Sequence, residues 1–248
     1  MPKYGLIGKS LEHSFSPTYF AQKFKQLNRE DCSYSAFPLD QIESLKALVY
    51  QQGLAGFNVT IPYKSAIIPL LYRIDDSALK VGAVNTVKVI WKDKTFQMEG
   101  YNTDIIGFRD SLLPFLKAQH QNALILGSGG ASKAIKVVLD ELSVESMIVS
   151  RDQRHDLTYA DLDKDTLAAH TLLINCTPLG TAPHVNEMPA IPWQALTKAH
   201  LVYDLVYNPQ ESMLLQKAKS KEAQTKNGLE MLHLQADAAW EIWTSTHI

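Results

Sequence analysis

The sequence predicts an α/β protein with two domains. Short apolar runs alternate with stretches whose apolar residues recur at helical spacing, a succession typical of strands and helices around a mainly parallel sheet. In the second half, a glycine-rich turn joins a continuous apolar run to a helical pattern. A chain of 248 residues is long enough for two domains of ordinary size.

The N-terminal part should contain two strand–helix units, a third strand and a hairpin. The hairpin is indicated by two apolar runs around the charged turn Lys92-Asp93-Lys94. The expected strands are 4–7, 33–38, 56–64, 84–90 and 95–100, and the expected helices are 17–27 and 39–52.

The segment GFNVTIPYK, residues 56–64, is interpreted as a half-buried strand that ends in a lysine. Successive side chains of a strand point to opposite faces. The inward side chains should be Phe57, Val59 and Ile61, and the side chains toward solvent should be Asn58 and Thr60. The segment alone does not say what Lys64 acts on.

The C-terminal part should begin with a linking helix at 103–116. Asp104 stands near its start, where a carboxylate is favoured beside the positive end of the helix dipole. This gives Asp104 a structural explanation that competes with any functional one. The strands expected after this helix are 123–126, 147–149, 172–174 and 201–206, and the helices are 133–142, 213–219 and 228–243.

Composition narrows the kinds of ligand and compartment. The chain has 26 acidic and 24 basic residues, which favours a small, nearly neutral ligand or a modest anion over nucleic acid. Cys32 and Cys176 are interpreted as reduced thiols. The first residues form neither a signal peptide nor a membrane span, so a cytoplasmic protein is expected. The eight histidines lack ligand spacing, so we expect them at the surface and expect no metal site.

The turn at 127–132 has the pattern of a dinucleotide site. Gly127, Gly129 and Gly130 follow a buried strand and precede a helix, which lets backbone N–H groups approach a pyrophosphate. Ser132 replaces the last glycine of the usual motif. The strand, turn and helix together still indicate a Rossmann-type nucleotide-binding domain.

The end of the next strand bears on which dinucleotide is bound. Arg151, with Arg154 or His155 behind it, suits the 2′-phosphate of NADP by charge and by the geometry of its guanidinium. Asp152 would repel that phosphate if it turned inward. The residues therefore favour NADP and leave NAD open.

Several motifs occur in a fixed order along nearly the whole chain. They are Gly5–Gly8, Ser14–Pro17, Gly56–Lys64, Gly82–Thr86, Gly100–Asp104, the nucleotide turn, Asn175–Gly180, Asp204–Pro209, Met231 and Gln235. In this order the chain resembles the shikimate dehydrogenases. Ser150-Arg151-Asp152 stands where that family commonly has Asn-Arg-Thr.

The resemblance implies NADP-linked, reversible reduction of 3-dehydroshikimate to shikimate in aromatic amino acid biosynthesis. It implies a substrate-binding domain at 1–101 completed by the C-terminal helix 228–248, a Rossmann-type NADP-binding domain at 102–227, and an active site in the cleft between them. The implied catalytic residues are Lys64 and Asp104. An ammonium group beside the ketone would stabilise the charge that develops on its oxygen and donate the proton; the sequence does not divide these two roles.

The same resemblance assigns binding residues. The implied substrate contacts are Ser14, Ser16, Asn58, Thr60, Asn85, Tyr207 and Gln235. The implied cofactor contacts are Asp76, Gly127, Ser128, Gly129, Gly130, Ala131, Ser150, Arg151, Thr177, Leu205 and Gly228. Four of these positions have competing explanations. Ser14 or Ser16 could cap the helix that begins near Pro17, Gln235 could be a solvated helix residue, and Asp76 could be an ordinary surface acid.

Two other interpretations of the function stay open. One is a quinate/shikimate dehydrogenase that uses NAD, which Asp152 allows. The other is a ligand sensor that binds a shikimate-like molecule without turnover, against which both Lys64 and Asp104 speak. In each case the partner is a small molecule rather than nucleic acid or membrane, and the protein is expected as a monomer or homodimer.

Overall fold

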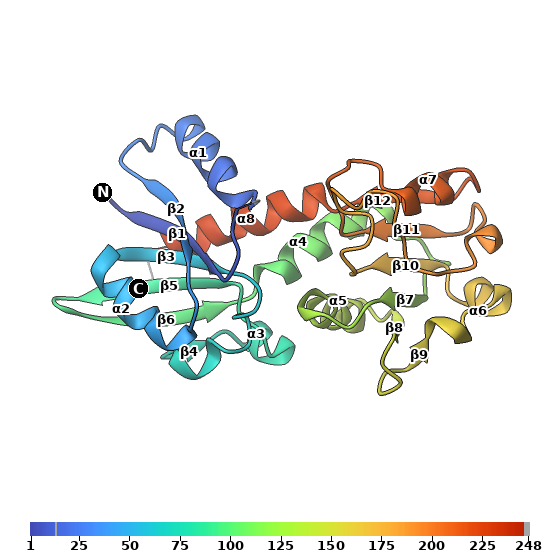
Figure 1. The fold of residues 1–248 in the computed structure, drawn as a ribbon, viewed down its shortest axis with the longest axis horizontal. Coiled ribbons are helices and arrows are strands. Elements are labelled where there is room, and N and C mark those ends of the chain that lie inside the picture. The colour runs from blue at the N-terminus through green and yellow to red at the C-terminus, as the bar shows by residue number, and fades with distance from the viewer. Residues whose placement is uncertain (13, 246–248) are drawn as a thin grey trace. The chain divides into compact units, whose positions relative to one another are not determined.

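The computed structural model describes residues 1–12 and 14–245, and these form two compact units (Figure 1). Unit 1 is Met1–Thr103 together with the end of the chain from Ala236, and unit 2 is Asp104–Gln235. The expected domains were 1–101 with 228–248, and 102–227; residues 246–248 of that expectation lie outside the described residues. Two helices, α4 (Thr103–Leu112) and α8 (Leu229–Thr244), contain the points at which the chain passes between the units.

Unit 1 contains a six-stranded mixed sheet in the order β2-β1-β3-β5-β6-β4. The strands are β1 Lys3–Gly8, β2 Ser33–Pro38, β3 Leu54–Val59, β4 Arg73–Ile74, β5 Thr86–Lys92 and β6 Thr95–Tyr101. The helices are α1 Ser16–Gln26, α2 Leu45–Gln52 and α3 Asp76–Val81. β1 is parallel to β2 and β3, whereas β5 is antiparallel to both β3 and β6. Three of the five strand pairs are parallel, so the expectation of a mainly parallel sheet holds, and the hairpin adds the two antiparallel pairs.

The segment 56–64 differs from its expected form. β3 ends at Val59, ahead of Pro62, which has no N–H to continue a strand. Ile61 is 76% exposed instead of inward, and Asn58 is 6% exposed instead of facing solvent. Both faces of β3 are covered, because Phe57 packs in one apolar cluster and Gly56 lies against Trp243 of another, and the alternation of burial is lost.

The core of unit 1 lies on both faces of this sheet. Leu45 and Val49 of α2 pack with Phe57 in one cluster. The other cluster is aromatic, and in it the ring centroids of Tyr4 and Trp243 stack 4.8 Å apart. Trp243 also donates a hydrogen bond from Nε1 to the Val87 carbonyl at 2.9 Å. Each fully buried aromatic side chain contributes about 1.5–3 kcal/mol, so the end of α8 is held firmly on unit 1.

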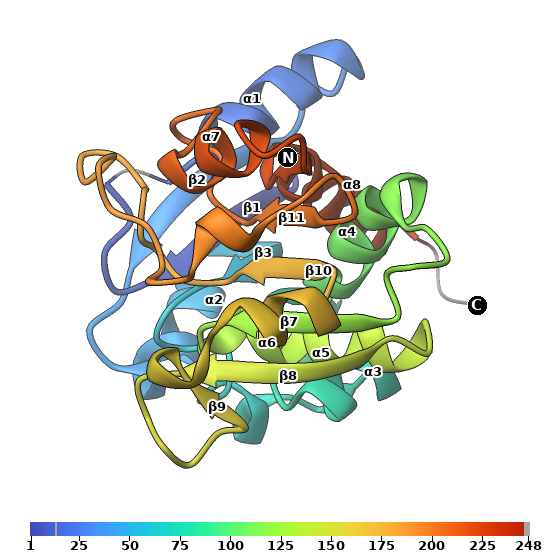
Figure 2. The same cartoon turned by 90° about the vertical axis from the view of Figure 1, so that its right-hand side faces the viewer.

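Unit 2 contains a six-stranded parallel sheet in the order β12-β11-β10-β7-β8-β9, much of which faces the viewer in Figure 2. The strands are β7 Asn122–Leu126, β8 Glu145–Ser150, β9 Leu157–Thr158, β10 Leu172–Asn175, β11 Leu201–Asp204 and β12 Gln224–Asn227. The helices besides α4 and α8 are α5 Gly130–Glu141, α6 Lys164–Ala169 and α7 Met213–Lys219. From β7 the chain adds β8 and β9 on one side and β10 to β12 on the other. The switch point between β7 and β10 is where ligands of such sheets bind, at the carboxyl ends of the strands.

Several short elements were not predicted from the sequence, namely α3, β4, α6, β9 and β12. They are two to six residues long, too short to show a hydrophobic period. Helix α2 begins at Leu45 rather than 39, after a 3₁₀ turn at Ile42–Ser44. The linking helix is also shorter than expected, since α4 ends at Leu112 and a 3₁₀ turn follows.

Two histidines expected at the surface, His120 and His200, are buried. Each closes a turn, because Nδ1 of His120 accepts from the N–H of Lys117 and Nδ1 of His200 accepts from the N–H of Thr197, both at 3.0 Å. Burial lowers the pKa of His120. Within residues 1–12 and 14–245, no helix has the length and apolar character needed to span a membrane.

Candidate active site

Three polar side chains of unit 1 form a chain across β2 and β3. The Tyr34 hydroxyl donates to Oδ1 of Asn58 at 2.9 Å. Burial raises the pKa of Tyr34, and a hydrogen bond with Ser16 opposes that rise. The N-cap residue of α1 is Phe15, and no side chain caps the helix, so the alternative role of Ser14 or Ser16 as a helix cap is not observed. Ser16 is instead linked through Tyr34 to Asn58.

Asn58 continues this chain toward the start of α4. Its Nδ2 donates to Oγ1 of Thr86 at 3.1 Å, and Oγ1 of Thr86 lies 3.0 Å from Oγ1 of Thr103. Oδ1 of Asn85 accepts from the backbone N–H of Thr103 at 2.8 Å. All four side chains are buried, and buried polar groups with every partner in place fix one arrangement.

The backbone of Lys64 is tied to the same segment. The N–H of Val84 donates to the Lys64 carbonyl at 2.7 Å, and the next residue, Asn85, holds Thr103. Asp104 follows Thr103 directly in the chain. Consecutive residues 84 and 85 thus anchor the end of the segment 56–64 and the residue before Asp104, although Lys64 and Thr103 are far apart in sequence.

The other expected residues of unit 1 have plainer surroundings. Thr60 follows β3, and its N–H donates to the Ile7 carbonyl at 2.8 Å. The N–H of Ser14 donates to the Leu11 carbonyl at 3.1 Å. Asp76 is exposed in the first turn of α3, whose cap is Asp75, which accepts from the N–H of Ser77 at 3.0 Å. The structure therefore gives Asp76 no contact that marks it for a cofactor.

In unit 2, the glycine turn follows the central strand β7. Gly127 has a φ of +104°, a conformation that favours glycine, and its N–H donates to the Val149 carbonyl at 2.8 Å. A Cβ at Gly127 would lie 2.9 Å from Cγ2 of Thr177. The turn therefore contacts β8 and Thr177, which lies two residues after the end of β10. β8 and β10 are the strands that flank β7.

Helix α5 begins at Gly130, three residues earlier than expected, and no side chain caps it. The first N–H groups of a helix lack partners within the helix, so the N–H groups around Ala131 suit an anion. Ser132, which replaces the third glycine, is buried and donates to the Gly129 carbonyl at 2.6 Å. Its hydroxyl therefore ties the first turn of α5 to Gly129, at the position where the usual motif has its last glycine.

The residues after β8 carry the charges next to this turn. Oγ of Ser150 lies 3.1 Å from Oγ of Ser128. The carboxylate of Asp152 accepts from Nε of Arg154 at 2.8 Å, and this hydrogen bond lowers the pKa of Asp152. Arg151 is exposed, and within residues 1–12 and 14–245 it forms no ion pair. The repulsion expected from Asp152 is thus offset by Arg154, and the guanidinium of Arg151 is available to a phosphate.

A buried carboxylate organises the loops after β10 and β11. Oδ1 of Asn175 accepts from the N–H and Oγ1 of Thr177 at 2.9 and 2.7 Å, and Nδ2 of Asn175 donates to Asp204 at 2.9 Å. Asp204 also accepts from the Val206 N–H at 3.0 Å and from Ser212. Burial raises the pKa of Asp204, and its three donors oppose that rise.

The last expected cofactor residues, Leu205 and Gly228, lie against each other. A Cβ at Gly228 would come within 2.1 Å of the Leu205 carbonyl oxygen, so only glycine fits there. Gln235 lies on α8, with Nε2 donating to the Leu232 carbonyl at 2.9 Å. Tyr207 is half-buried, and burial raises its pKa.

Five residues of these networks were not predicted from the sequence as site residues: Tyr34, Thr86, Thr103, Asn175 and Asp204. Four of them lie inside motifs that were recognised, so a signal for them existed. Tyr34 had none, because a tyrosine in an ordinary strand pattern is unremarkable in sequence. Within the described ranges, no cluster of three His, Cys, Asp or Glu side chains could hold a metal ion.

The fold and these residues define a two-unit α/β protein with a nucleotide-binding turn in one unit and a buried polar network in the other. A family model described as the shikimate dehydrogenase substrate binding domain matches residues 6–87. The NADP(+)-dependent shikimate dehydrogenase of Clostridium botulinum is 39% identical, with 96% of this chain and 95% of that protein covered. The chain belongs to the shikimate dehydrogenase family.

Solved structures agree with this assignment. Shikimate 5-dehydrogenase from Thermus thermophilus, in complex with NADP(H) and shikimate, has a TM-score of 0.84 at 29% identity and covers 98% of this chain and 94% of its own. Quinate dehydrogenase from Corynebacterium glutamicum, in complex with NAD, has a TM-score of 0.88 at 28% identity and covers 98% and 93%. The predicted family and the predicted α/β fold with a Rossmann-type unit are confirmed.

Proposed function

We propose that this chain is an oxidoreductase that catalyses the reversible NADPH-dependent reduction of 3-dehydroshikimate to shikimate. The names of its relatives support the reaction and the cofactor. The assignment of Lys64 and Asp104 as the catalytic residues rests on two hydrogen bonds. One joins Val84 to the Lys64 carbonyl, and the other joins Asn85 to Thr103, the residue before Asp104. An acid/base pair built on distant segments needs such an anchor.

Lys64 is the proton donor in this proposal. Reduction of a ketone places negative charge on its oxygen, and an ammonium group within hydrogen-bond reach stabilises that charge and supplies the proton. The hydrogen bond to the Lys64 carbonyl fixes the backbone from which the side chain extends. Asp104, next to the anchored Thr103, would accept a hydrogen bond from a substrate hydroxyl and favour the charged form of the lysine.

The unit 1 network is proposed to bind the hydroxyl groups of the substrate. Asn58 and Asn85 are held by neighbours that use part of their hydrogen-bonding capacity, which fixes their orientation. Thr60 lies just beyond Asn58, Ser14 precedes α1, and Ser16 is the first residue of α1. We assign the ring carboxylate to the two serines and Tyr207, and the hydroxyls to the remaining residues and Gln235. A wrong substrate would leave a buried partner unpaired, at a cost of about 1–3 kcal/mol.

The turn of unit 2 fits the pyrophosphate of NADP. The positive φ of Gly127, the uncapped start of α5 and the nearby side chains Ser128 and Ser150 form a cradle of N–H and hydroxyl groups. The exposed guanidinium of Arg151 would bind the 2′-phosphate. Thr177, Leu205 and Gly228 would border the rest of the cofactor, and Asp76 keeps only its family-based assignment. When bound there, NADPH supplies the hydride.

We further propose that the enzyme acts on a small-molecule substrate in the cytoplasm, as a monomer or homodimer, and binds neither nucleic acid nor membrane. The net charge of −2 supports the absence of a nucleic-acid or membrane partner, because it gives no attraction for nucleic acid or anionic lipid. The proposed domain roles are substrate binding for the N-terminal part with the C-terminal helix, and dinucleotide binding for the part between them.

The reaction is tested by following nicotinamide absorbance with shikimate or quinate, each with NADP⁺ or NAD⁺. We expect rapid reduction of NADP⁺ by shikimate and much slower turnover in the other three pairings. Faster turnover of quinate with NAD⁺ would contradict the proposed substrate and cofactor. If calorimetry shows binding of shikimate but no pairing gives turnover, the protein is a sensor and the proposal is wrong.

A further inference from the structure

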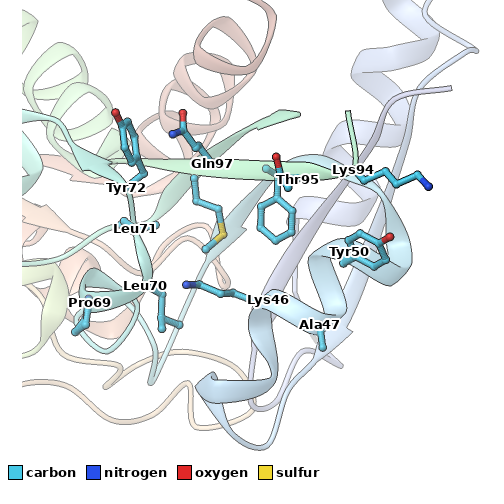
Figure 3. Close-up of a pocket in the computed structure, with 12 residues that line it drawn as sticks. Lys46, Ala47, Tyr50, Pro69, Leu70, Leu71, Tyr72, Lys94, Thr95 and Gln97 are labelled. Atoms are coloured by element: carbon cyan, nitrogen blue, oxygen red, sulfur yellow. The ribbon is translucent and has the colours of Figure 1, made fainter. Parts of the chain in front are cut away.

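A groove on unit 1 is not used by the proposed reaction. Its volume is about 680 Å³, and it is lined by α2, the segment before β4 and the first half of β6. Figure 3 shows Lys46 extending from α2 toward Leu70, with Tyr50 and Tyr72 at different ends of the groove. The size is that of a ligand site, so the question is what kind of ligand fits.

One wall of the groove is the free edge of a sheet. β6 pairs with β5 along its whole length, but on its other side β4 pairs only with Glu99 and Gly100. The Met98 carbonyl accepts from the Tyr72 N–H at 2.9 Å, so the backbone groups of Met98 point to this outer side. By the two-residue period of a strand, the N–H and carbonyl of Phe96 point there too. Among the described strands, none lies beside Phe96 on that side.

The side chains of the groove add apolar surface and positive charge. Tyr50 and Tyr72 are 56% and 69% exposed, which is unusual for large aromatic residues. Lys46 and Lys94 are the charged residues of the lining, which contains no acid. Within residues 1–12 and 14–245, neither lysine forms an ion pair. A partner for this groove should therefore carry carboxylates and apolar side chains.

We propose that the groove is a docking site for an extended acidic segment of another protein, which pairs with the free edge of β6 as an additional strand. Unpaired backbone groups supply hydrogen bonds to any extended peptide, and the side-chain pockets supply the preference. Alternate side chains of the peptide would rest on Tyr50 and Tyr72. Its carboxylates would meet Lys46 and Lys94.

A second copy of this chain fits the groove less well. A two-fold contact through β6 would place the same surface on both sides, so the lysines of one copy would face the lysines of the other. The lining has no acid to offset that repulsion. A small anion would use the lysines but would leave the backbone of Phe96 without partners.

The test is fluorescence anisotropy with the full chain and a labelled heptapeptide whose alternate positions carry valine, glutamate, glutamate and phenylalanine, so that carboxylates and apolar side chains share the face toward the groove. We expect saturable binding, a loss of at least tenfold in affinity when lysines replace the glutamates, and a similar loss when alternate peptide nitrogens are methylated. The double variant K46E/K94E should weaken binding at least tenfold. The matched variant K198E, on the exposed surface of unit 2, should not change it.

Three results would overturn the proposal. The first is no binding of the glutamate peptide at millimolar protein, which leaves Lys94 as a residue that only protects a strand edge from aggregation. The second is binding that is unaffected by methylation, which means that the groove takes anions and not a strand. The third is self-association without peptide, measured by sedimentation and abolished in K46E/K94E. Dehydrogenase activity, expected to be unchanged in both K46E/K94E and K198E, reports that each variant is folded.

Discussion

The two units position their functional groups by different means. In unit 1, the arrangement depends on side-chain hydrogen bonds between distant segments, such as the bond from Thr103 N–H to Asn85. In unit 2, it depends mainly on backbone geometry, such as the positive φ of Gly127 and the close approach of Gly228 to Leu205. A small polar substrate offers hydroxyls that only oriented side chains can distinguish, whereas a pyrophosphate is recognised by any well-placed set of N–H groups.

This difference predicts how each unit responds to mutation. Removing a side chain from the unit 1 network should affect stability and turnover together, because the same bonds hold the fold and orient the substrate. Adding a side chain to the unit 2 turn should affect cofactor affinity, because the turn works by the absence of side chains. Single substitutions in the two units should therefore differ in which property they change, and their effects should decrease in the order Lys64, Asn85, Gly127, Arg151 and Asp204.

Replacing Lys64 by methionine should have the largest effect. The change removes the ammonium group and keeps the aliphatic stem, so the proton donor and the charge opposite the ketone oxygen are lost. We expect kcat to fall by about 10²–10⁴ with little change in NADPH affinity. The control is K25M, an exposed lysine on α1. A kcat within threefold of the unmodified enzyme would remove Lys64 from the mechanism.

Replacing Asn85 by alanine should damage both stability and turnover. The variant leaves the buried N–H of Thr103 without its acceptor, which should lower the free energy of unfolding by about 1–3 kcal/mol in urea titrations. We also expect a drop in kcat, because Thr103 precedes Asp104. N122A removes a more exposed amide and should cost less than about 0.5 kcal/mol. A stable N85A enzyme with normal kcat would contradict the role of the network.

Replacing Gly127 by alanine tests the backbone of the nucleotide turn. Alanine is strained at a φ of +104°, and its Cβ would press on Thr177, so NADPH affinity should fall about tenfold and stability by about 1–3 kcal/mol. G129A is the matched variant, because a Cβ there meets nothing within 4 Å and φ is −77°. It should keep its stability in thermal melts. Equal melting temperatures for both variants would show that φ is not the constraint.

How far the sequence predicted the fold depended on the length of each element. β2 and α7 were placed at both ends correctly, because a strand between turn residues and a helix with a clear apolar face carry their own signals. The segment 56–64 was misjudged, because its burial is set by the apolar clusters on the two faces of β3 and not by its own pattern. Short elements such as β4 and α3 were invisible, since they exist only through contacts with longer ones.

The candidate site divides in the same way. The nucleotide turn was predicted from Gly127, Gly129 and Gly130, since its geometry is local in sequence. The links from Tyr34 to Asn58 and from Asn85 to Thr103 were not, because they join residues 24 and 18 positions apart. The doubt about Asp152 was also decided by structure, as its carboxylate is paired with Arg154. Hydrogen bonds across a sheet leave no pattern in a single sequence.

Arg151 is an exception in unit 2, because it is proposed to recognise the cofactor through its side chain and not through backbone geometry. A charge-assisted bond to the 2′-phosphate is worth about 1.5–3 kcal/mol, so R151A should weaken NADPH about tenfold or more and leave NADH unchanged. R154A should have a smaller effect on NADPH alone, because it frees the carboxylate of Asp152. Dissociation constants from nicotinamide fluorescence measure both. Equal losses for the two cofactors in R151A would show that it does not bind the 2′-phosphate.

The smallest effect should appear in the pH dependence of D204N. Burial raises the pKa of Asp204 in the folded protein, so above the unfolded value of 3.8 the unfolded chain binds fewer protons at this group than the folded chain does. The contribution of Asp204 to stability therefore decreases as pH rises from that value through the folded pKa. Asparagine keeps an acceptor for Asn175 and Val206 and does not titrate, so D204N should gain stability relative to the unmodified protein as the pH rises above 3.8. Urea unfolding at several pH values measures the difference. If the difference is the same at every pH, then the hydrogen bonds from Ser212, Val206 and Asn175 fully offset the burial of the carboxylate, and Asp204 acts only through its geometry.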